Sequence, residues 1–273
     1  LAPESKMIAG VDVQQAKASP FGQLLLSQLG AAAQLDKLRS TTGFDPLTDF
    51  REMAVGSTAD GKAVVAGRGR FQPQLLTTMA GMAGFPTETY RGVALVGAAG
   101  TAGLPAQDAV IAFLNQEFVV MGDRAQTKGA IDRWLAANGA SPLVAIVNDV
   151  SAGSQAWVVA TGLTEMQAAL GNKQAGQNNP MLNILDKIDR IGGGLNFNDT
   201  VTVKGLAVTK TAQDAQALAG VLQLSTAMAG NRNPLPATPQ ISATGNAVNF
   251  TMSMTEQQLE NLIRPRTSLR ASR

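Results

Sequence analysis

Apolar residues along the chain recur either at every second position or at every third to fourth position, and the two periods predict strands and helices. The first half predicts the order strand, helix, hairpin, helix, hairpin, helix. These elements are expected at Met7–Val13, Pro20–Leu29, Phe50–Arg70, Pro73–Met82, Arg91–Met121 and Ala125–Leu135. Within the second hairpin, the apolar run Val110–Met121 is too long for one strand, and Asn115-Gln116 predicts a turn inside it.

The second half predicts the same order of elements. They are expected at Gln155–Thr161, Thr164–Leu170, Gly193–Lys210, Ala212–Met228, Gln240–Met254 and Glu256–Ile263. The expected strands Ala63–Arg70 and Val201–Val208 begin 138 residues apart. A repeated order of elements is typical of a duplicated supersecondary unit. The sequence therefore predicts one repeat unit over residues 1–138, a second over 139–263 and a flexible basic tail over 264–273.

Short turns join most of the expected strands. Asp60-Gly61 predicts a two-residue type I′ hairpin turn, and Gly245-Asn246 predicts a second. Parallel strands need long crossover connections, whereas hairpins join antiparallel neighbours. The predicted fold class is therefore α+β, with internally duplicated βα-ββα-ββα units, a largely antiparallel sheet and helices on one face.

Composition removes several kinds of chemistry. The 273 residues include no cysteine and no histidine, which excludes disulfides, thiol nucleophiles, imidazole bases and serine–histidine triads. The longest clean apolar run, Ala109–Leu114, is far shorter than the about 20 residues of a membrane-spanning helix. We expect no transmembrane helix, and the sequence assigns no catalytic, cofactor-binding or metal-binding residue.

The charge pattern favours export over nucleic-acid binding. The net charge is +2, and four arginines lie in the last ten residues, so the rest of the chain carries −2. Arg68-Gly69-Arg70 is a small basic spot with no aromatic residue interleaved, which is a weak nucleic-acid signal. Leu1–Ser5 is not a signal peptide. Charged residues make up 15% of the chain, and together with the absence of cysteine this predicts an exported protein whose signal peptide has been removed.

Two glycine-rich segments suggest binding motifs but fit them poorly, and a third indicates a strand irregularity. Gly56–Ala63 resembles a phosphate-binding loop, yet Ala63 stands where that loop needs serine or threonine, and a strand follows it. Gly97–Gly103 lacks the spacing of a dinucleotide-binding turn, so a hairpin loop is the better interpretation. Gly192–Gly194 lies at the start of a strand and predicts a bulge or bend.

The acidic residues are scattered. Asp186 and Asp189 would lie one helical turn apart and could face a cation, but the interleaved Lys187 and Arg190 favour a solvated helix face. A second group could line a pocket, although a turn cap with superficial salt bridges is the simpler interpretation. This group contains Asp45, Asp49, Arg51 and Glu52.

Two segments carry a resemblance to known proteins. Ala18–Gly22 and Thr42–Glu52 resemble segments of uncharacterised exported proteins of soil bacteria. The resemblance covers most of the first half loosely. It implies a secreted or surface-attached precursor and no particular activity, so no functional residue can be transferred.

Three functional hypotheses follow. The first is a non-catalytic binding or structural module of the cell envelope, with an unidentified protein or envelope component as partner. The second is a carrier of an apolar or lipid-like ligand, which a deep apolar cavity would favour. The third is a carboxylate-dependent hydrolase, which a cleft with two facing carboxylates would favour.

Overall fold

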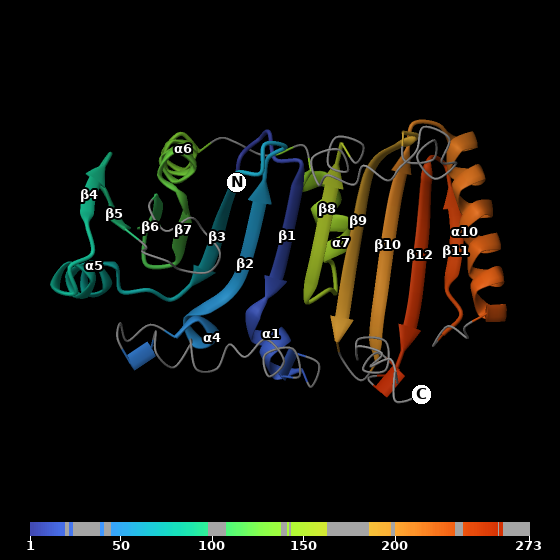
Figure 1. Ribbon diagram of the computed structural model, residues 1–273, viewed down its shortest axis with the longest axis horizontal. Coiled ribbons are helices and arrows are strands. Elements are labelled where there is room, and N and C mark those ends of the chain that lie inside the picture. Colours follow the sequence, from blue (N-terminus) through green and yellow to red (C-terminus); the bar gives the residue numbers. More distant parts are fainter. Residues whose placement is uncertain are drawn as a thin grey trace, which may run out of the picture.

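The computed structural model describes residues 1–19, 22–23, 39–40, 45–97, 108–137, 141, 143–162, 186–197, 200–232, 237–255 and 257–258. These residues form a single antiparallel sheet with helices packed on it (Figure 1). The strands are β1 (Met7–Asp12), β2 (Phe50–Ser57), β3 (Ala63–Gly69), β4 (Thr87–Tyr90), β5 (Val93–Gly97), β6 (Ala109–Phe113), β7 (Phe118–Asp123), β8 (Ala156–Thr161), β9 (Ile188–Phe197), β10 (Val201–Thr209), β11 (Gln240–Thr244) and β12 (Ala247–Met254). The helices are α1 (Val13–Ala18), α4 (Pro46–Asp49), α5 (Pro73–Met82), α6 (Arg124–Leu135), α7 (Val144–Ser151) and α10 (Ala212–Arg232).

The two halves of the chain meet at one pair of strands in the middle of the sheet. The order of the 12 strands is β11-β12-β10-β9-β8-β1-β2-β3-β7-β6-β5-β4. β1 and β8 are antiparallel, and Ala9 is paired with Val158 at the centre of their overlap. From this seam, the first half extends one way and the second half extends the other way (Figure 1).

The largely antiparallel sheet is confirmed, but the sequence misplaced part of the first half. The segment expected to form one hairpin, Arg91–Met121, contributes to two hairpins instead. β4 pairs with β5 around a turn at Arg91 and Gly92, and β6 pairs with β7 around the predicted turn at Asn115. β4 escaped prediction because its sequence, Thr-Glu-Thr-Tyr, is short and mostly polar.

The two expected glycine turns differ from each other. Ser57 pairs with Ala63, and Thr58 N–H donates to the Lys62 carbonyl at 2.9 Å, which leaves a three-residue loop. Only Gly61 in this loop has a positive φ, of 81°, so the expected two-residue type I′ turn is wrong there. Gly245 and Asn246 do form a two-residue turn, in which only Gly245 has a positive φ, as in a type II′ turn.

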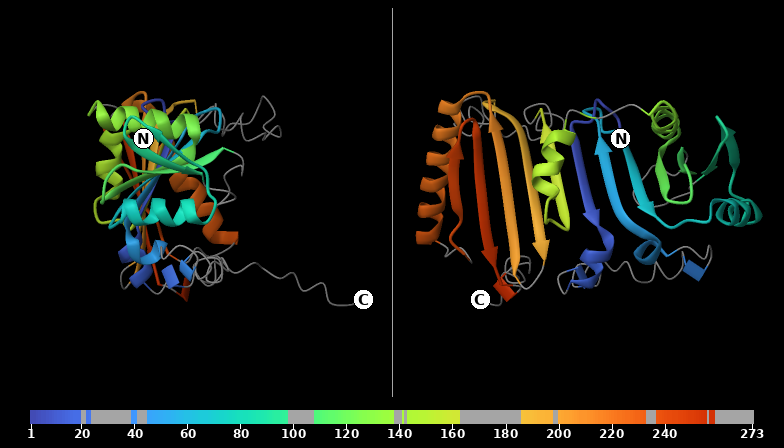
Figure 2. Two further views of the ribbon diagram at one scale, coloured as in Figure 1. Left: turned by 90° about the vertical axis from the view of Figure 1, so that its left-hand side faces the viewer. Right: turned by 180° about the vertical axis from the view of Figure 1, so that it is seen from behind.

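Helices cover both faces of the sheet, so the prediction of helices on one face is wrong. Consecutive residues of a strand point to opposite faces. In β10, Leu206 packs with the cluster under α7, whereas Ala207 packs with the cluster under α10. We call these the α7 face and the α10 face. Figure 2 shows α7 in front of β8 in the view from behind.

The α7 face is held together by two apolar clusters. Ile8 of β1 and Val159 of β8 are directly paired and contact Ile146 and Val150 of α7. The second cluster joins α6 to the first half of the sheet and contains Val64, Leu95, Val110, Ala112, Val120, Ala130 and Ile131. Full burial of one such large aliphatic side chain stabilises the fold by about 1.5–3 kcal/mol. The two clusters therefore fix α6 and α7 on the same face of the sheet, one on each half.

Two glycines allow α7 to lie close to the sheet. A Cβ atom at Gly194 would stand 2.6 Å from the carbonyl oxygen of Val150, and one at Gly192 would stand 2.6 Å from a methyl group of Val150. Both glycines pair regularly with β8 and β10, and the irregularity of this ladder lies at Val208 instead. The expected bulge or bend at Gly192–Gly194 is therefore wrong, and close helix packing is the reason for the glycines.

Several of the expected helices, and the expected division into repeat units, are not tested by the described residues. The helices expected at 20–29, 164–170 and 256–263 and the tail 264–273 fall wholly or almost wholly outside the described residues. The boundary expected at residue 138 falls between α6 and α7 in the chain, and the sheet is continuous from one half to the other. The internal duplication stays a prediction. No helix in the described part of the chain has the length and hydropathy needed to cross a membrane.

Replacing Gly194 by alanine tests the close approach of α7. Because the added Cβ atom would collide with the backbone of Val150, we expect Gly194→Ala to lower the free energy of unfolding by about 1–3 kcal/mol. Gly193→Ala is the matched control, since a Cβ atom there would meet its nearest neighbour at 3.5 Å on the opposite face. Denaturant unfolding compares the two variants. An equal loss in both would show that the sheet itself, rather than the approach of α7, excludes a side chain at these positions.

Candidate functional site

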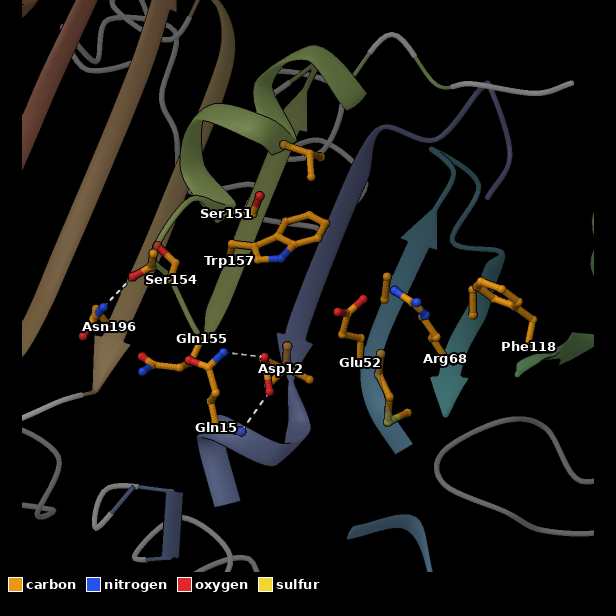
Figure 3. Close-up of a pocket in the computed structure, with 17 residues that line it drawn as sticks. Asp12, Gln15, Glu52, Arg68, Phe118, Ser151, Ser154, Gln155, Trp157 and Asn196 are labelled. Atoms are coloured by element: carbon orange, nitrogen blue, oxygen red, sulfur yellow. Dashed lines mark hydrogen bonds between the residues drawn. The ribbon is translucent and has the colours of Figure 1, made fainter. Parts of the chain in front are cut away.

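A cleft opens on the α7 face, across the seam between the two halves of the sheet (Figure 3). Its volume is about 700 Å³. β1, β2, β3 and β8 form its floor, and α7 and the turn after it form one wall. The residues that line it are Val11, Asp12, Gln15, Glu52, Met53, Ala54, Ala66, Gly67, Arg68, Phe118, Val147, Ser151, Gly153, Ser154, Gln155, Trp157 and Asn196.

A row of small residues lies beneath the cleft, and Ala54 and Ala66 of this row line its floor. Gly10, Ala54 and Ala66 are directly paired across β1, β2 and β3, so their side chains point to the same face. Trp157 of β8 is paired with Gly10 on the other side. A Cβ atom at Gly10 would lie 2.5 Å from Cε2 of the indole, so the absence of a side chain there lets the indole lie across β1. The ring forms one wall above a shallow floor.

A row of charged residues borders this floor. Each of them lies two positions along its strand from a small residue of the first row. Asp12 pairs with Glu52, Glu52 pairs with Arg68, and Arg68 pairs with Phe118. These four side chains therefore project to the α7 face from four neighbouring strands. Figure 3 shows Glu52 and Trp157 on either side of β1, both directed into the hollow. The site thus combines an apolar floor with two carboxylates, one guanidinium and two aromatic rings.

The carboxylate of Asp12 is fixed by the helix that follows it. Asp12 is the N-cap of α1 and accepts a hydrogen bond from the backbone N–H of Gln15 at 2.8 Å. Its other oxygen accepts from Nε2 of Gln15 at 2.7 Å. The backbone N–H of Asp12 donates to the carbonyl of Gln155 at 2.7 Å, which extends the seam by one residue. Asp12 therefore has a structural task at the edge of the cleft.

Glu52 and Arg68 are neighbours, yet no ion pair joins them within the described structure. Both residues are exposed. The guanidinium carbon of Arg68 lies 5.9 Å from the centre of the Phe118 ring, which in turn lies 5.2 Å from the ring of Trp134 on α6. The guanidinium is thus held over an aromatic face, and the Glu52 carboxylate remains open to the cleft.

The end of the cleft below α7 is fixed by hydrogen bonds. Gln155 is 4% exposed, and its Oε1 accepts from the backbone N–H of Phe197 at 2.5 Å. Asn196 donates from Nδ2 to the carbonyl of Gly153 in the turn after α7. These contacts tie β8, β9 and the turn together, so this wall is built before any ligand arrives.

The acidic residues that lie close together in the sequence belong to different elements of the structure. Asp45 caps α4 by accepting from Leu47 N–H at 3.0 Å, as the turn-cap interpretation requires. Glu52 lies in β2 and lines the cleft, which agrees with the pocket alternative. Asp189 lies in β9, so the helix face expected for Asp186 and Asp189 is wrong. Among the described residues, no group of three or more acidic side chains is placed to hold a metal ion.

The loop that resembles a phosphate-binding motif is a hairpin end. The ammonium group of Lys62 lies 2.9 Å from Asp60 Oδ2. The hydroxyl of Thr58 donates to Asp60 and, with Lys62, lowers the pKa of that carboxyl to about 2. A strand follows the loop, as the sequence predicts. Gly97 ends β5, and residues 98–103 of the other glycine-rich segment lie outside the described residues.

Several lining residues carried no motif that sequence reasoning recognised. Arg68 stands out in the sequence only as part of a small basic spot, and no motif marks Asp12, Phe118 or Trp157. A usable signal exists in the strands themselves. β1 and β2 each place a small residue two positions from a carboxylate, and β3 places Ala66 two positions from Arg68. Period two puts both members of such a pair on one face.

Comparison with known proteins places the fold. No protein-family model and no curated protein matches the chain. The structure is similar to crystal form I of TP0453, with a TM-score of 0.56 and 10% sequence identity over 96% of this chain and 94% of that one. At this identity the likeness shows a shared fold alone. The resemblance to exported proteins of soil bacteria stays a prediction.

Two substitutions separate the structural task of Asp12 from its charge. Asp12→Ala removes the cap of α1, so we expect a loss of about 1 kcal/mol in the free energy of unfolding. Asp12→Asn keeps an oxygen that accepts from Gln15 N–H and should stay within a few tenths of a kcal/mol of the unmodified protein. Urea unfolding measures both. Similar losses in the two variants would mean that the carboxylate charge, not the cap, stabilises this corner.

Proposed function

We propose that the protein is a non-catalytic binding protein that holds one small amphipathic molecule in the cleft. The observation that carries this proposal is the pair Ala54 and Ala66, which forms a recessed apolar floor between the Trp157 indole, lying over Gly10, and Phe118. A flat sheet face with larger side chains at these positions would leave no recess. The apolar part of the ligand lies on this floor, and its polar part meets the charged row.

The dimensions and lining of the cleft support ligand binding. Its volume of about 700 Å³ is within the range of small-molecule sites, which run from about 300 to 1,000 Å³. Such sites combine apolar walls with a few oriented polar groups. Here the walls are aromatic, and the polar groups come from adjacent strands at fixed spacing. This arrangement favours a carrier over a module that binds through a flat polar surface.

The carboxylate-dependent hydrolase ranks below this function. Asp12 and Glu52 are adjacent, as that hypothesis requires. However, both oxygens of Asp12 accept hydrogen bonds from Gln15, so this carboxylate serves as a helix cap. A general acid or base needs a group that is free to exchange a proton with the substrate. The geometry therefore supports binding better than bond cleavage.

Export and internal duplication are parts of the same proposal. The low content of charged residues and the absence of cysteine support export. The order β1-β2-β3-β7-β6 runs outward from the seam in the first half, and β8-β9-β10-β12-β11 runs outward in the second. If β6 and β7 correspond to β11 and β12, then β4 and β5 are an addition at the edge of the first half. This correspondence supports a duplicated unit.

Tryptophan fluorescence tests ligand binding directly. The chain has two tryptophans, so Trp134→Phe leaves Trp157 as the only indole and retains an aromatic neighbour for Phe118. We expect its emission to change saturably with at least one of three amphiphiles below their micellar concentrations: dodecyl maltoside, dodecyl sulfate or dodecyltrimethylammonium. In this background, Ala54→Leu should fill the floor and weaken that binding at least about tenfold.

Two controls make the result decisive. Ala243→Leu adds the same side chain at an exposed position of β11, away from the cleft, and should leave the affinity unchanged. Unfolding curves of both leucine variants show whether each remains folded. The proposal is wrong if none of the three amphiphiles binds saturably, or if Ala54→Leu binds as tightly as Ala243→Leu.

A further inference from the structure

The charged row implies which head group the ligand carries, given the binding function proposed above. We propose that the cleft takes an amphiphile with a cationic head, an alkylammonium or quaternary ammonium group. The cation lies between the indole of Trp157 and the carboxylate of Glu52, and the apolar chain follows the small-residue floor. The pairing of the strands, the charge balance of the row and the position of the indole all favour this head group.

Two like charges face each other at the border of the cleft. Asp12 and Glu52 are directly opposite each other on β1 and β2. Directly opposed residues have Cβ atoms about 4.5–5.5 Å apart, and like charges at such positions destabilise a sheet. The contacts of Asp12 with Gln15 involve only neutral donors, which orient the carboxylate without neutralising it. A cation placed beside the pair would remove this repulsion.

Among the described residues that line the cleft, Arg68 is the one cationic side chain. Arg68 pairs with Glu52 on the other side, but no ion pair between them is found among the described residues. Its guanidinium lies over the Phe118 ring instead, at 5.9 Å from the ring centre. The row therefore carries two carboxylates and one guanidinium, and its acidic end faces Trp157. This end has a net negative charge that a ligand can meet.

The indole of Trp157 supplies an aromatic face for the cation. Among aromatic side chains, tryptophan binds cations most strongly over its face. Trp157 leans across Gly10 toward β2, and Figure 3 shows Glu52 on the far side of β1. Two strand spacings separate β8 from β2, about 9.6 Å. The indole and the Glu52 side chain extend into this span from its two sides, so we expect an ammonium group over β1 to contact both.

Two kinds of molecule carry such an ammonium group. The ammonium group can belong to a free cationic amphiphile, or to a zwitterionic head group in which a phosphate stands next to a quaternary amine. In the second case Arg68 lies beside Glu52 and meets the phosphate. Both sources share the contact of the cation with Trp157 and Glu52, and that contact is the inference.

The test compares head groups on one chain length in the Trp134→Phe background. We expect dodecyltrimethylammonium to bind at least about tenfold more tightly than dodecyl sulfate, because charge-assisted contacts favour only the cation. Glu52→Gln should weaken dodecyltrimethylammonium about tenfold and leave dodecyl maltoside unchanged. Glu117→Gln is the matched control, because Glu117 is an exposed glutamate in the turn between β6 and β7, outside the cleft.

A second arm distinguishes the two sources. Arg68→Gln should weaken dodecylphosphocholine without weakening dodecyltrimethylammonium if the natural head group is zwitterionic. If the natural ligand is a simple cation, the same variant should strengthen dodecyltrimethylammonium and leave dodecylphosphocholine within a factor of two. Asp12→Asn, which keeps the cap of α1, should weaken both cationic probes in either case. Unfolding curves confirm that each variant is folded.

The outcomes separate this inference from the binding function. Saturable binding with no preference for the cation, or equal effects of Glu52→Gln and Glu117→Gln, would overturn the cationic head group and leave the proposed function standing. Tighter binding of dodecyl sulfate would overturn it as well, since Arg68 would then direct the ligand. Failure of all probes to bind would overturn both. A cationic preference that Glu52→Gln removes supports the inference.

Discussion

The α7 face depends on the close approach of a helix and an indole to the sheet, at positions where glycine leaves room for them. Gly192 and Gly194 let α7 lie against β9, and Gly10 lets the Trp157 indole lie across β1. Each glycine in a strand weakens that strand by about 0.5–1 kcal/mol relative to alanine. In return, the helix and the indole approach the sheet at van der Waals distance. Larger residues at these three positions would lift both walls of the cleft.

The alternation of side chains along each strand then makes the cleft amphipathic. Neighbouring strands in register place residues of one kind in rows across the sheet. One row supplies Gly10, Ala54 and Ala66, and the next row along the strands supplies Asp12, Glu52 and Arg68. An apolar floor and a charged border therefore follow from the same strand pairing. A slip of one strand by one residue would turn its members of both rows to the opposite face.

Local signals in the sequence predicted much of the fold and little of the site. The hairpin around Gly61 and the helix Pro73–Met82 are encoded by neighbouring residues, and both are present. The cleft depends on the order of β8, β1, β2 and β3, which brings Trp157 beside Gly10 across a long stretch of chain. Nothing in either short segment specifies that neighbour. The local sequence therefore favours a turn cap over a pocket for Glu52, and a bulge or bend at Gly192–Gly194, although Glu52 lines the cleft and the glycines admit α7.

The seam between β1 and β8 also implies an order of assembly: hairpins close locally, whereas Ala9 and Val158 are 149 residues apart. Joining ends across that span costs roughly 4 kcal/mol of chain entropy, by (3/2)RT ln n. Contacts of this range form slowly. The cleft exists only after that closure, because Trp157 comes from one half and Gly10 and Glu52 from the other. A molecule bound there contacts both halves. Because it binds only the closed sheet, its binding energy stabilises the folded protein as a whole.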